Sequence, residues 1–142
     1  TDNQATITGY SGDDTEVVIP AEVDGITVVK VEEDAFKDNH SVSSINIPVG
    51  VERIGKDAFR GCDSLTNITV DTDNLNYSSV DGVLFSKLQT SLIAYSVAKL
   101  DTYIIPERVT SIGAYAFASC TNLTSIIIRL NIRTCLRTPI TV

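Results

Sequence analysis

Apolar and polar positions recur along the chain with a period of 23 residues. The stretch 28–48, VVKVEEDAFKDNHSVSSINIP, aligns with 51–71, VERIGKDAFRGCDSLTNITVD. A third copy, VTSIGAYAFASCTNLTSIII, occupies 109–128, so one unit between them carries about 12 extra residues. The shared template is V-x-x-I-G-x-x-A-F-x-x-C-x-x-L-x-x-I-x-I-P. A repeat of this regularity predicts that each unit forms one coil, and that each coil copies the shape of the coil beneath it.

Within each unit, the alternation of apolar and polar residues predicts a short strand. In LTNITV, Leu65, Ile68 and Val70 are predicted to point inward, and the residues between them outward, subject to a bend after Leu65. A coil of this size cannot bury its apolar face alone, so stacked coils share one core. The pattern therefore predicts a mainly β leucine-rich repeat solenoid with coils of about 23 residues, short helical turns and a hairpin insertion. The strands are expected near 17–19, 45–47, 68–70, 104–105 and 126–128.

The segments DAFRGC and AYAFASC connect to these strands and are too short for a regular helix. We expect about one helical turn in each. Each copy places a phenylalanine in this segment, at Phe36, Phe59 and Phe117. The three rings are predicted to stack as an aromatic spine.

Two regions depart from the repeat and carry hairpin signals. In residues 1–27, ATITGY and TEVVIP flank the polar SGDD, which predicts a hairpin that caps the first coil. The long unit, residues 71–106, contains the β-rich runs VLF (83–85) and LIAY (92–95), separated by the polar SKLQTS. These runs predict an inserted strand pair.

The template A-F-x-x-C-x-x-L-x-x-I-x-I-P, with V-x-x-I-G before it, resembles the BspA-type leucine-rich repeat family. The resemblance covers about residues 7–128, including the N-terminal opening and the long unit. The chain departs from the family pattern at Leu75, where the family often has proline, and at Asp71 and Arg129, which replace the strand-ending proline. The family contains bacterial and some protist surface proteins. The resemblance therefore implies a secreted or cell-surface protein that binds other proteins or mediates adhesion, with host extracellular matrix proteins as candidate partners; the alternative is a structural spacer in a larger surface protein.

The composition narrows the function further. Hydrophobic residues make up 43% of the chain, which excludes a disordered tail. The formal net charge of −7 disfavours a nucleic-acid partner. No apolar run is long enough for a membrane span. The chain begins at Thr1 and contains no methionine, so we expect a processed or excerpted piece. We assign residues 1–128 to the solenoid and 129–142, which hold three arginines and no acid, to an atypical tail. That tail is predicted to be a truncated or frame-shifted end, with a divergent cap as the alternative.

Few residues are candidates for chemistry. Cys62 and Cys120 share one template position, which Asn39 occupies in the first copy, and such positions satisfy loop backbone groups inside a coil. A nucleophilic cysteine needs a neighbouring base, and the single histidine, His40, aligns beside Asp63, one coil from Cys62. One histidine without a C-x-x-C pair does not suit zinc. The segment DTDNLNYSSVDG (71–82) lacks the glycine and glutamate of a calcium loop and is read as a polar turn. We therefore expect no enzyme activity, no metal and no cofactor.

What remains is the outward row of the predicted strands. It consists of small polar side chains with few charges, and we predict that it forms a protein-binding face, the alternative being a merely solvated sheet. The row is Ser43, Ser44, Asn46, Thr66, Asn67, Thr69, Thr124, Ser125 and Ile127.

Overall fold

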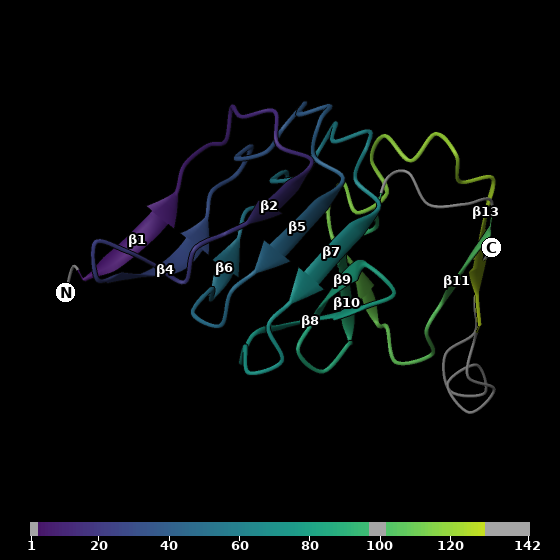
Figure 1. Cartoon of the computed structure of the whole chain (residues 1–142). Helices are drawn as coiled ribbons and strands as arrows, with labels where there is room; N and C mark the ends of the chain where they lie inside the picture. The colour runs from purple at the N-terminus through teal and green to yellow at the C-terminus, as the bar shows by residue number, and fades with distance from the viewer. Residues whose placement is uncertain (1–2, 97–101, 130–142) are drawn as a thin grey trace.

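A computed structural model describes residues 3–96 and 102–129 of the chain (Figure 1). The described residues form stacked coils, and each coil contributes one strand to either side of the stack. We call one side the front ladder. It consists of β2 (Glu16–Val18), β5 (Ser44–Ile47), β7 (Asn67–Val70), β11 (Thr102–Ile105) and β13 (Ser125–Ile128).

On the other side is the back ladder, whose strand begins 11 to 18 residues before the front-ladder strand of the same coil. It consists of β1 (Gln4–Ile7), β4 (Ile26–Val31), β6 (Arg53–Ile54), β10 (Ser91–Ala94) and β12 (Ser111–Ile112). The V-x-x-I part of the template forms β4, β6 and β12, where the sequence pattern predicted no strand; β6 and β12 are only two residues long. Three further strands lie outside the two ladders, namely β3 (Glu22–Val23), β8 (Tyr77–Val80) and β9 (Val83–Ser86).

The front ladder confirms the predicted strands and their register. Strands β5 and β7 pair in parallel, with Ile45 opposite Ile68 and Asn46 opposite Thr69, and β11 pairs with β13 in the same 23-residue register, with Ile104 opposite Ile127. The repeat length sets this register, because a shift by one residue would turn the apolar side chains out of the core.

The two ladders are each interrupted in the middle of the stack. On the front, β7 does not pair with β11, and on the back, β6 does not pair with β10. The antiparallel strands β8 and β9 lie at this interruption, and β9 also pairs with β10. The outer edge of β7 meets this insertion, because Ile68 N donates to Gly82 O at 3.0 Å and Val70 N donates to Ser79 Oγ at 3.1 Å.

The inserted strand pair was therefore predicted correctly at β9 and β10, but the insertion also contains β8. Asp81 and Gly82 join β8 to β9 in a two-residue turn, with φ of 51° and 80°. Positive φ at both turn residues favours Asp-Gly in a hairpin. The same pair, Asp24 and Gly25, joins β3 to β4. This dipeptide was the signal that could have located both hairpins.

The expected N-terminal hairpin is wrong. Strand β1 pairs in parallel with β4, and β2 pairs in parallel with β5, so residues 4–18 form a coil of their own. Tyr10 N donates to Ala35 O at 2.8 Å, as Phe36 N donates to Ala58 O one coil later. The polar SGDD segment is the loop that crosses from one ladder to the other.

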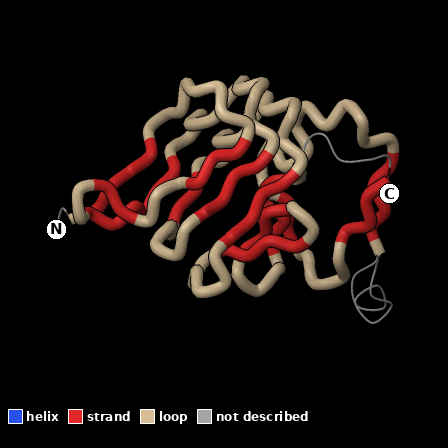
Figure 2. The backbone as a smooth tube through the Cα atoms, in the orientation of Figure 1, coloured by secondary structure: helices blue, strands red, loops and turns tan. Residues whose placement is uncertain are grey.

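The predicted helical turns are also replaced, since the described residues contain no helix (Figure 2). The segment 55–65 is a series of tight turns in which, for example, Ala58 N donates to Gly55 O at 3.1 Å and Cys62 N donates to Phe59 O at 3.2 Å. Gly61, at a φ of 77°, interrupts any helical run. Positive φ at this position turns the chain back toward the front ladder, which a helical turn would not do.

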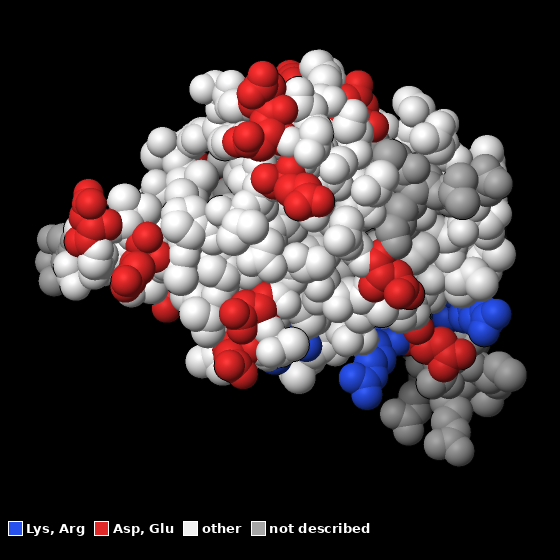
Figure 3. Space-filling model, in the orientation of Figure 1, with Lys and Arg blue, Asp and Glu red and all other residues white. Residues whose placement is uncertain are grey.

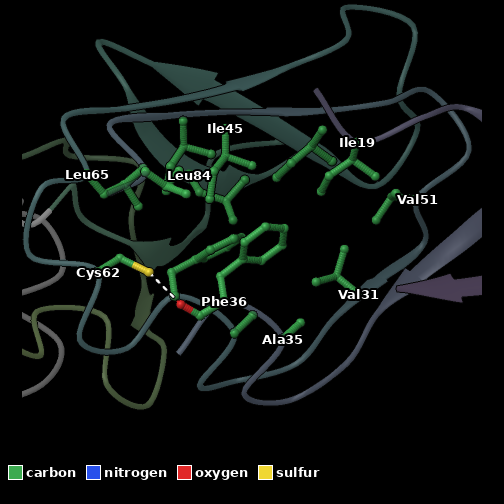
Figure 4. Close-up of a cluster of buried hydrophobic side chains, with 14 of the residues drawn as sticks. Ile19, Val31, Ala35, Phe36, Ile45, Val51, Cys62, Leu65 and Leu84 are labelled. Carbon is green, nitrogen blue, oxygen red and sulfur yellow. Dashed lines mark hydrogen bonds between the residues drawn. The ribbon is translucent and has the colours of Figure 1, made fainter. Parts of the chain in front are cut away.

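The core lies between the two ladders and is divided by the interruption. One cluster fills the first three coils and includes Val31, Phe36, Ile45 and Leu65 (Figure 4). A second, smaller cluster is built around Phe85, Leu92 and Tyr95.

The aromatic spine follows this division. Phe36 stacks on Phe59 with ring centroids 5.8 Å apart, as predicted, but Phe117 contacts Tyr95 and Tyr103 in the second cluster instead. Tyr10 extends the first stack, with its centroid 5.5 Å from that of Phe36. Tyr10 and Tyr95 occupy the phenylalanine position of their coils, which the template concealed because their flanking sequences diverge.

Candidate protein-binding surface

The predicted face begins on the front ladder, where β5 and β7 hold its polar side chains in rows. Ser44 lies opposite Asn67, and Asn46 lies opposite Thr69. Asn46 Nδ2 donates to Thr69 Oγ1 at 2.9 Å, so the row is ordered by hydrogen bonds between adjacent coils. These four side chains are half-buried.

Two further predicted residues, Ser43 and Thr66, precede these strands. Thr66 Oγ1 donates to Ser43 O at 3.1 Å, and Ser43 Oγ donates to Thr15 O at 2.9 Å. The first six predicted residues therefore lie together on the surface of coils two and three. Much of their hydrogen-bonding capacity is used within the solenoid.

The remaining three predicted residues do not adjoin them in the sheet. Thr124 precedes β13, which carries Ser125 and Ile127, and β13 pairs with β11 in a separate two-stranded sheet. The predicted face is thus not one continuous array. The long unit places the insertion β8–β9 between its two parts, which the 23-residue template could not show.

Apolar side chains occupy the outward positions at both ends of the front ladder, and the sequence reasoning passed over most of them. Val18 is 72% exposed on β2, while Ile104 and Ile127 are 43% and 41% exposed on β11 and β13. Ile126 and Ile128, which align with Ile68 and Val70 of the third coil, are also exposed, by 42% and 61%. The described residues place no further strand beside β13, so this last coil buries less of its apolar surface than the earlier ones.

Charged side chains surround the polar row. In the view of Figure 3, acidic residues form separate groups around the molecule, while the centre, over β5 and β7, is mostly uncharged. The uncharged centre follows from the sequence, because the outward strand positions of these two coils carry no acid or base.

The cysteines have the packing role that was expected. Cys62 is fully buried, and its Sγ donates to Phe36 O of the preceding coil at 2.9 Å (Figure 4). Asn39, at the equivalent position, accepts hydrogen bonds at Oδ1 from the backbone N–H groups of Ser41 and Val42, both at 3.0 Å. Burial raises the pKa of the Cys62 thiol to about 11. The thiolate, which is the nucleophilic form, is therefore scarce at neutral pH.

The candidate Cys/His pair does not form. His40 Nδ1 lies 2.9 Å from Asp63 Oδ1, as the alignment predicted, but both side chains are more than half exposed and Cys62 lies inside the core. Burial also raises the pKa of Cys120 to about 11. Cys135 lies outside the described residues. In the described ranges, no group of three or more histidine, cysteine or acidic side chains is arranged to hold a metal ion.

The segment 71–82, which lacks the glycine and glutamate of a calcium loop, has a structural role. Asn74 is fully buried, and its Nδ2 donates to Pro48 O at 2.9 Å and to Val51 O at 3.0 Å. Its Oδ1 accepts hydrogen bonds from Asn76 N and Tyr77 N, both at 2.8 Å. This side chain joins the end of one coil to the start of the insertion, which satisfies buried backbone groups.

Comparison with family models assigns the fold to a family. The model described as the BspA type leucine-rich repeat region matches residues 29–137 with six copies. The chain belongs to the BspA-type leucine-rich repeat family. A comparison with curated proteins found no match.

Several solved structures are similar to this chain. The pneumococcal vaccine antigen PcpA is 29% identical with a TM-score of 0.70, over 75% of this chain and 27% of PcpA. A leucine-rich repeat protein from Eubacterium ventriosum is 28% identical with a TM-score of 0.66, over 72% of this chain and 33% of its own. A leucine-rich cell surface protein from Faecalibacterium prausnitzii is 27% identical with a TM-score of 0.56, over 79% of this chain and 41% of its own.

The chain therefore spans about a third of the Eubacterium ventriosum protein and about a quarter of PcpA. Its fold is that of bacterial leucine-rich repeat proteins, some of them of the cell-surface type. Leucine-rich repeats of this kind are typically non-enzymatic scaffolds. Across the described part of the chain, we find no helical segment with the length and apolarity that crossing a membrane requires.

Proposed function

We propose that this chain is a protein-binding domain of a secreted or cell-surface protein, and that the front ladder over β5 and β7 contacts the partner. The observation that carries the proposal is the ordered polar row from Ser44 to Thr69, which is uncharged and lies at the centre of one face (Figure 3). Solenoids use such extended surfaces for binding. Similarity to a cell-surface protein and to a vaccine antigen supports an extracellular setting.

The partner that we propose is a protein of a host extracellular matrix or surface, in keeping with an adhesive role. A small polar row of this kind gives few buried aromatic or arginine anchors, so a single fragment should bind weakly. Binding should then grow when several copies are linked.

A panel of immobilised extracellular matrix proteins, probed with the monomeric chain and with a streptavidin-clustered form, tests the proposal. A double variant, Thr66→Arg with Thr69→Arg, places two long cations on the row. The matched control, Gln4→Arg with Thr6→Arg, adds the same charges at exposed positions of β1 on the back ladder. We expect the first variant to lose binding and the control to retain it. Equal binding by both variants would show that the front ladder is the wrong surface.

The second candidate function is a structural spacer. It is favoured by the internal hydrogen bonds of the row, such as Thr66 Oγ1 to Ser43 O, which leave fewer groups for a partner. If neither the monomeric nor the clustered chain binds any protein on the panel, the spacer function replaces the binding function.

A further inference from the structure

The interruption between coils three and four leaves a small pocket on the surface. Its walls come from both sides of the gap, from residues 54–60 before the insertion and from residues 93–95 and 115–118 after it. It lies where the back ladder is broken between β6 and β10 and where the two hydrophobic clusters meet. The pocket is therefore a product of the long unit, because a continuous ladder would have closed it.

The lining of this pocket combines aromatic rings with basic side chains. Phe59, which belongs to the first aromatic stack, and Tyr95, which belongs to the second, both line the pocket. Tyr115 lines it from the side that follows the insertion. The described lining contains two cations, Lys56 and Arg60, and no acidic, asparagine or glutamine side chain. The charge of this lining is therefore opposite in sign to the net charge of the chain, which is −7.

Arg60 is held in place and yet lacks a charged partner. Its backbone N donates to Asp57 O at 3.1 Å, and its O accepts from Asp38 N at 2.8 Å. Its guanidinium lies over the ring of Tyr115, 5.4 Å from the centroid. Among the described residues, no hydrogen bond or ion pair to this guanidinium is formed.

The other charged groups nearby are already engaged or lie outside the lining. Lys56 Nζ lies 3.7 Å from Glu33 Oε1, which offsets part of its charge. Asp57 belongs to the same turn and is buried, but it does not line the pocket. Arg60 is thus the group whose donors can meet a ligand.

We propose that this pocket binds a carboxylate side chain of a partner protein, one that stands next to an apolar residue in the partner. A guanidinium recognises a carboxylate by paired hydrogen bonds, and stacking on a ring fixes its plane beforehand. The apolar walls of Ile54, Ile93 and Ala94 suit a neighbouring aliphatic or aromatic side chain. An acidic sugar fits less well, because its hydroxyl groups would find no amide or carboxylate side chains in the lining.

This site adds a second contact surface, at the back-ladder gap, and rests on the proposed function only in that the partner is a protein. It is tested with short peptides, independently of the panel of extracellular matrix proteins. The ¹⁵N-labelled chain is titrated with an acetylated, amidated peptide Ala-Leu-Glu-Ala, and amide and Arg side-chain shifts are followed by NMR. The matched peptide Ala-Leu-Gln-Ala has the same shape without the charge.

We expect the Glu peptide to shift the resonances of Arg60, Tyr115 and Ala116, and the Gln peptide to leave them unchanged. Raising the salt concentration from 50 to 500 mM should weaken the Glu peptide severalfold, since the pocket is open to solvent. Arg60→Gln should weaken it by about tenfold, the effect of losing a charged hydrogen bond. The control Arg53→Gln removes an exposed cation of the same coil outside the pocket and should change nothing.

A second variant, Tyr115→Asn, tests whether the Tyr115 ring under the Arg60 guanidinium contributes to binding. Tyr115 has a φ of 59°, which asparagine tolerates, so the backbone is kept while the ring is lost. We expect a severalfold loss of binding. Equal shifts with both peptides, no shift with either, or an equal loss from Arg53→Gln would overturn the proposal. Binding of glucuronate as tight as that of the Glu peptide would overturn the choice of a protein ligand.

Discussion

Replacing Phe36 with alanine should be among the most destabilising single changes in this chain. Phe36 is 1% exposed and contacts a ring on each side, Tyr10 and Phe59. The substitution removes roughly 150 Å² of buried apolar surface, which at about 25 cal/mol per Å² corresponds to about 4 kcal/mol. This value lies within the range of about 3–5 kcal/mol measured for such changes in cores.

Phe59→Ala provides the internal comparison. Phe59 occupies the same template position but is 7% exposed, has one ring partner and borders the pocket at the interruption. Surrounding groups and water can reach the space it leaves, so we expect a smaller cost of about 3 kcal/mol. Thr69→Ala, on the surface, loses one hydrogen bond from Asn46 and should cost at most about 1 kcal/mol.

Urea unfolding followed by far-ultraviolet circular dichroism measures all three variants. The free energy of unfolding should fall in the order Phe36→Ala, Phe59→Ala, Thr69→Ala, with the largest loss first. A domain of this size has about 5–15 kcal/mol in total, so Phe36→Leu serves as a milder variant if Phe36→Ala does not fold. A loss for Phe59→Ala equal to or above that for Phe36→Ala would refute the divided spine. Equal urea midpoints for Phe59→Ala and Thr69→Ala would refute the place of Phe59 in the core.

Four further outcomes follow from the buried Cys62 and Asn74 side chains and from the turn at Gly82. In a Cys120→Ser, Cys135→Ser background, Cys62 should fail to react with Ellman's reagent at pH 8 until urea unfolds the chain, because it is buried and its pKa is raised to about 11. The same raised pKa should lower the free energy of unfolding as the pH rises from about 9 to about 11, since the unfolded thiol ionises first, and Cys62→Ala should show a shallower decline. Asn74→Ala should lower the free energy of unfolding by about 3 kcal/mol or more, measured by urea denaturation, because two backbone donors and two backbone acceptors lose their partner; a loss below about 1 kcal/mol would contradict this role. Gly82→Ala should lower the melting temperature by several degrees, because its φ is 80° and a Cβ would lie 2.9 Å from Asn67 Oδ1; an unchanged melting temperature would contradict the close approach.

The repeat made the fold class, the front-ladder strands and their register predictable. Ile45 and Ile68 align in the sequence and lie opposite each other in the sheet, because stacked coils of equal length bring equal positions together. The same logic placed Cys62 inside the core and His40 beside Asp63. It failed at Tyr10 and Tyr95, where tyrosine occupies the phenylalanine position of the template and the flanking residues do not match the template.

The candidate face shows where the sequence stopped being sufficient. Ser44, Asn46, Asn67 and Thr69 were predicted as neighbours and are neighbours, because their coils follow each other without an insertion. Ile127 was predicted on the same face but lies in another sheet, because the insertion separates its coil from theirs. Aligning the repeats shows which positions are equivalent, but it does not show how far an insertion displaces the next coil.

The sequence by itself determined which residues form the core of the second and third coils and how these coils are registered, because a 23-residue period permits only one stacking that keeps the apolar residues inside. Only the tertiary structure decided how the long unit breaks both ladders, divides the core in two and opens a pocket around Arg60. Those features depend on contacts between residues far apart in the chain, such as Arg60 over Tyr115, and no local pattern encodes them.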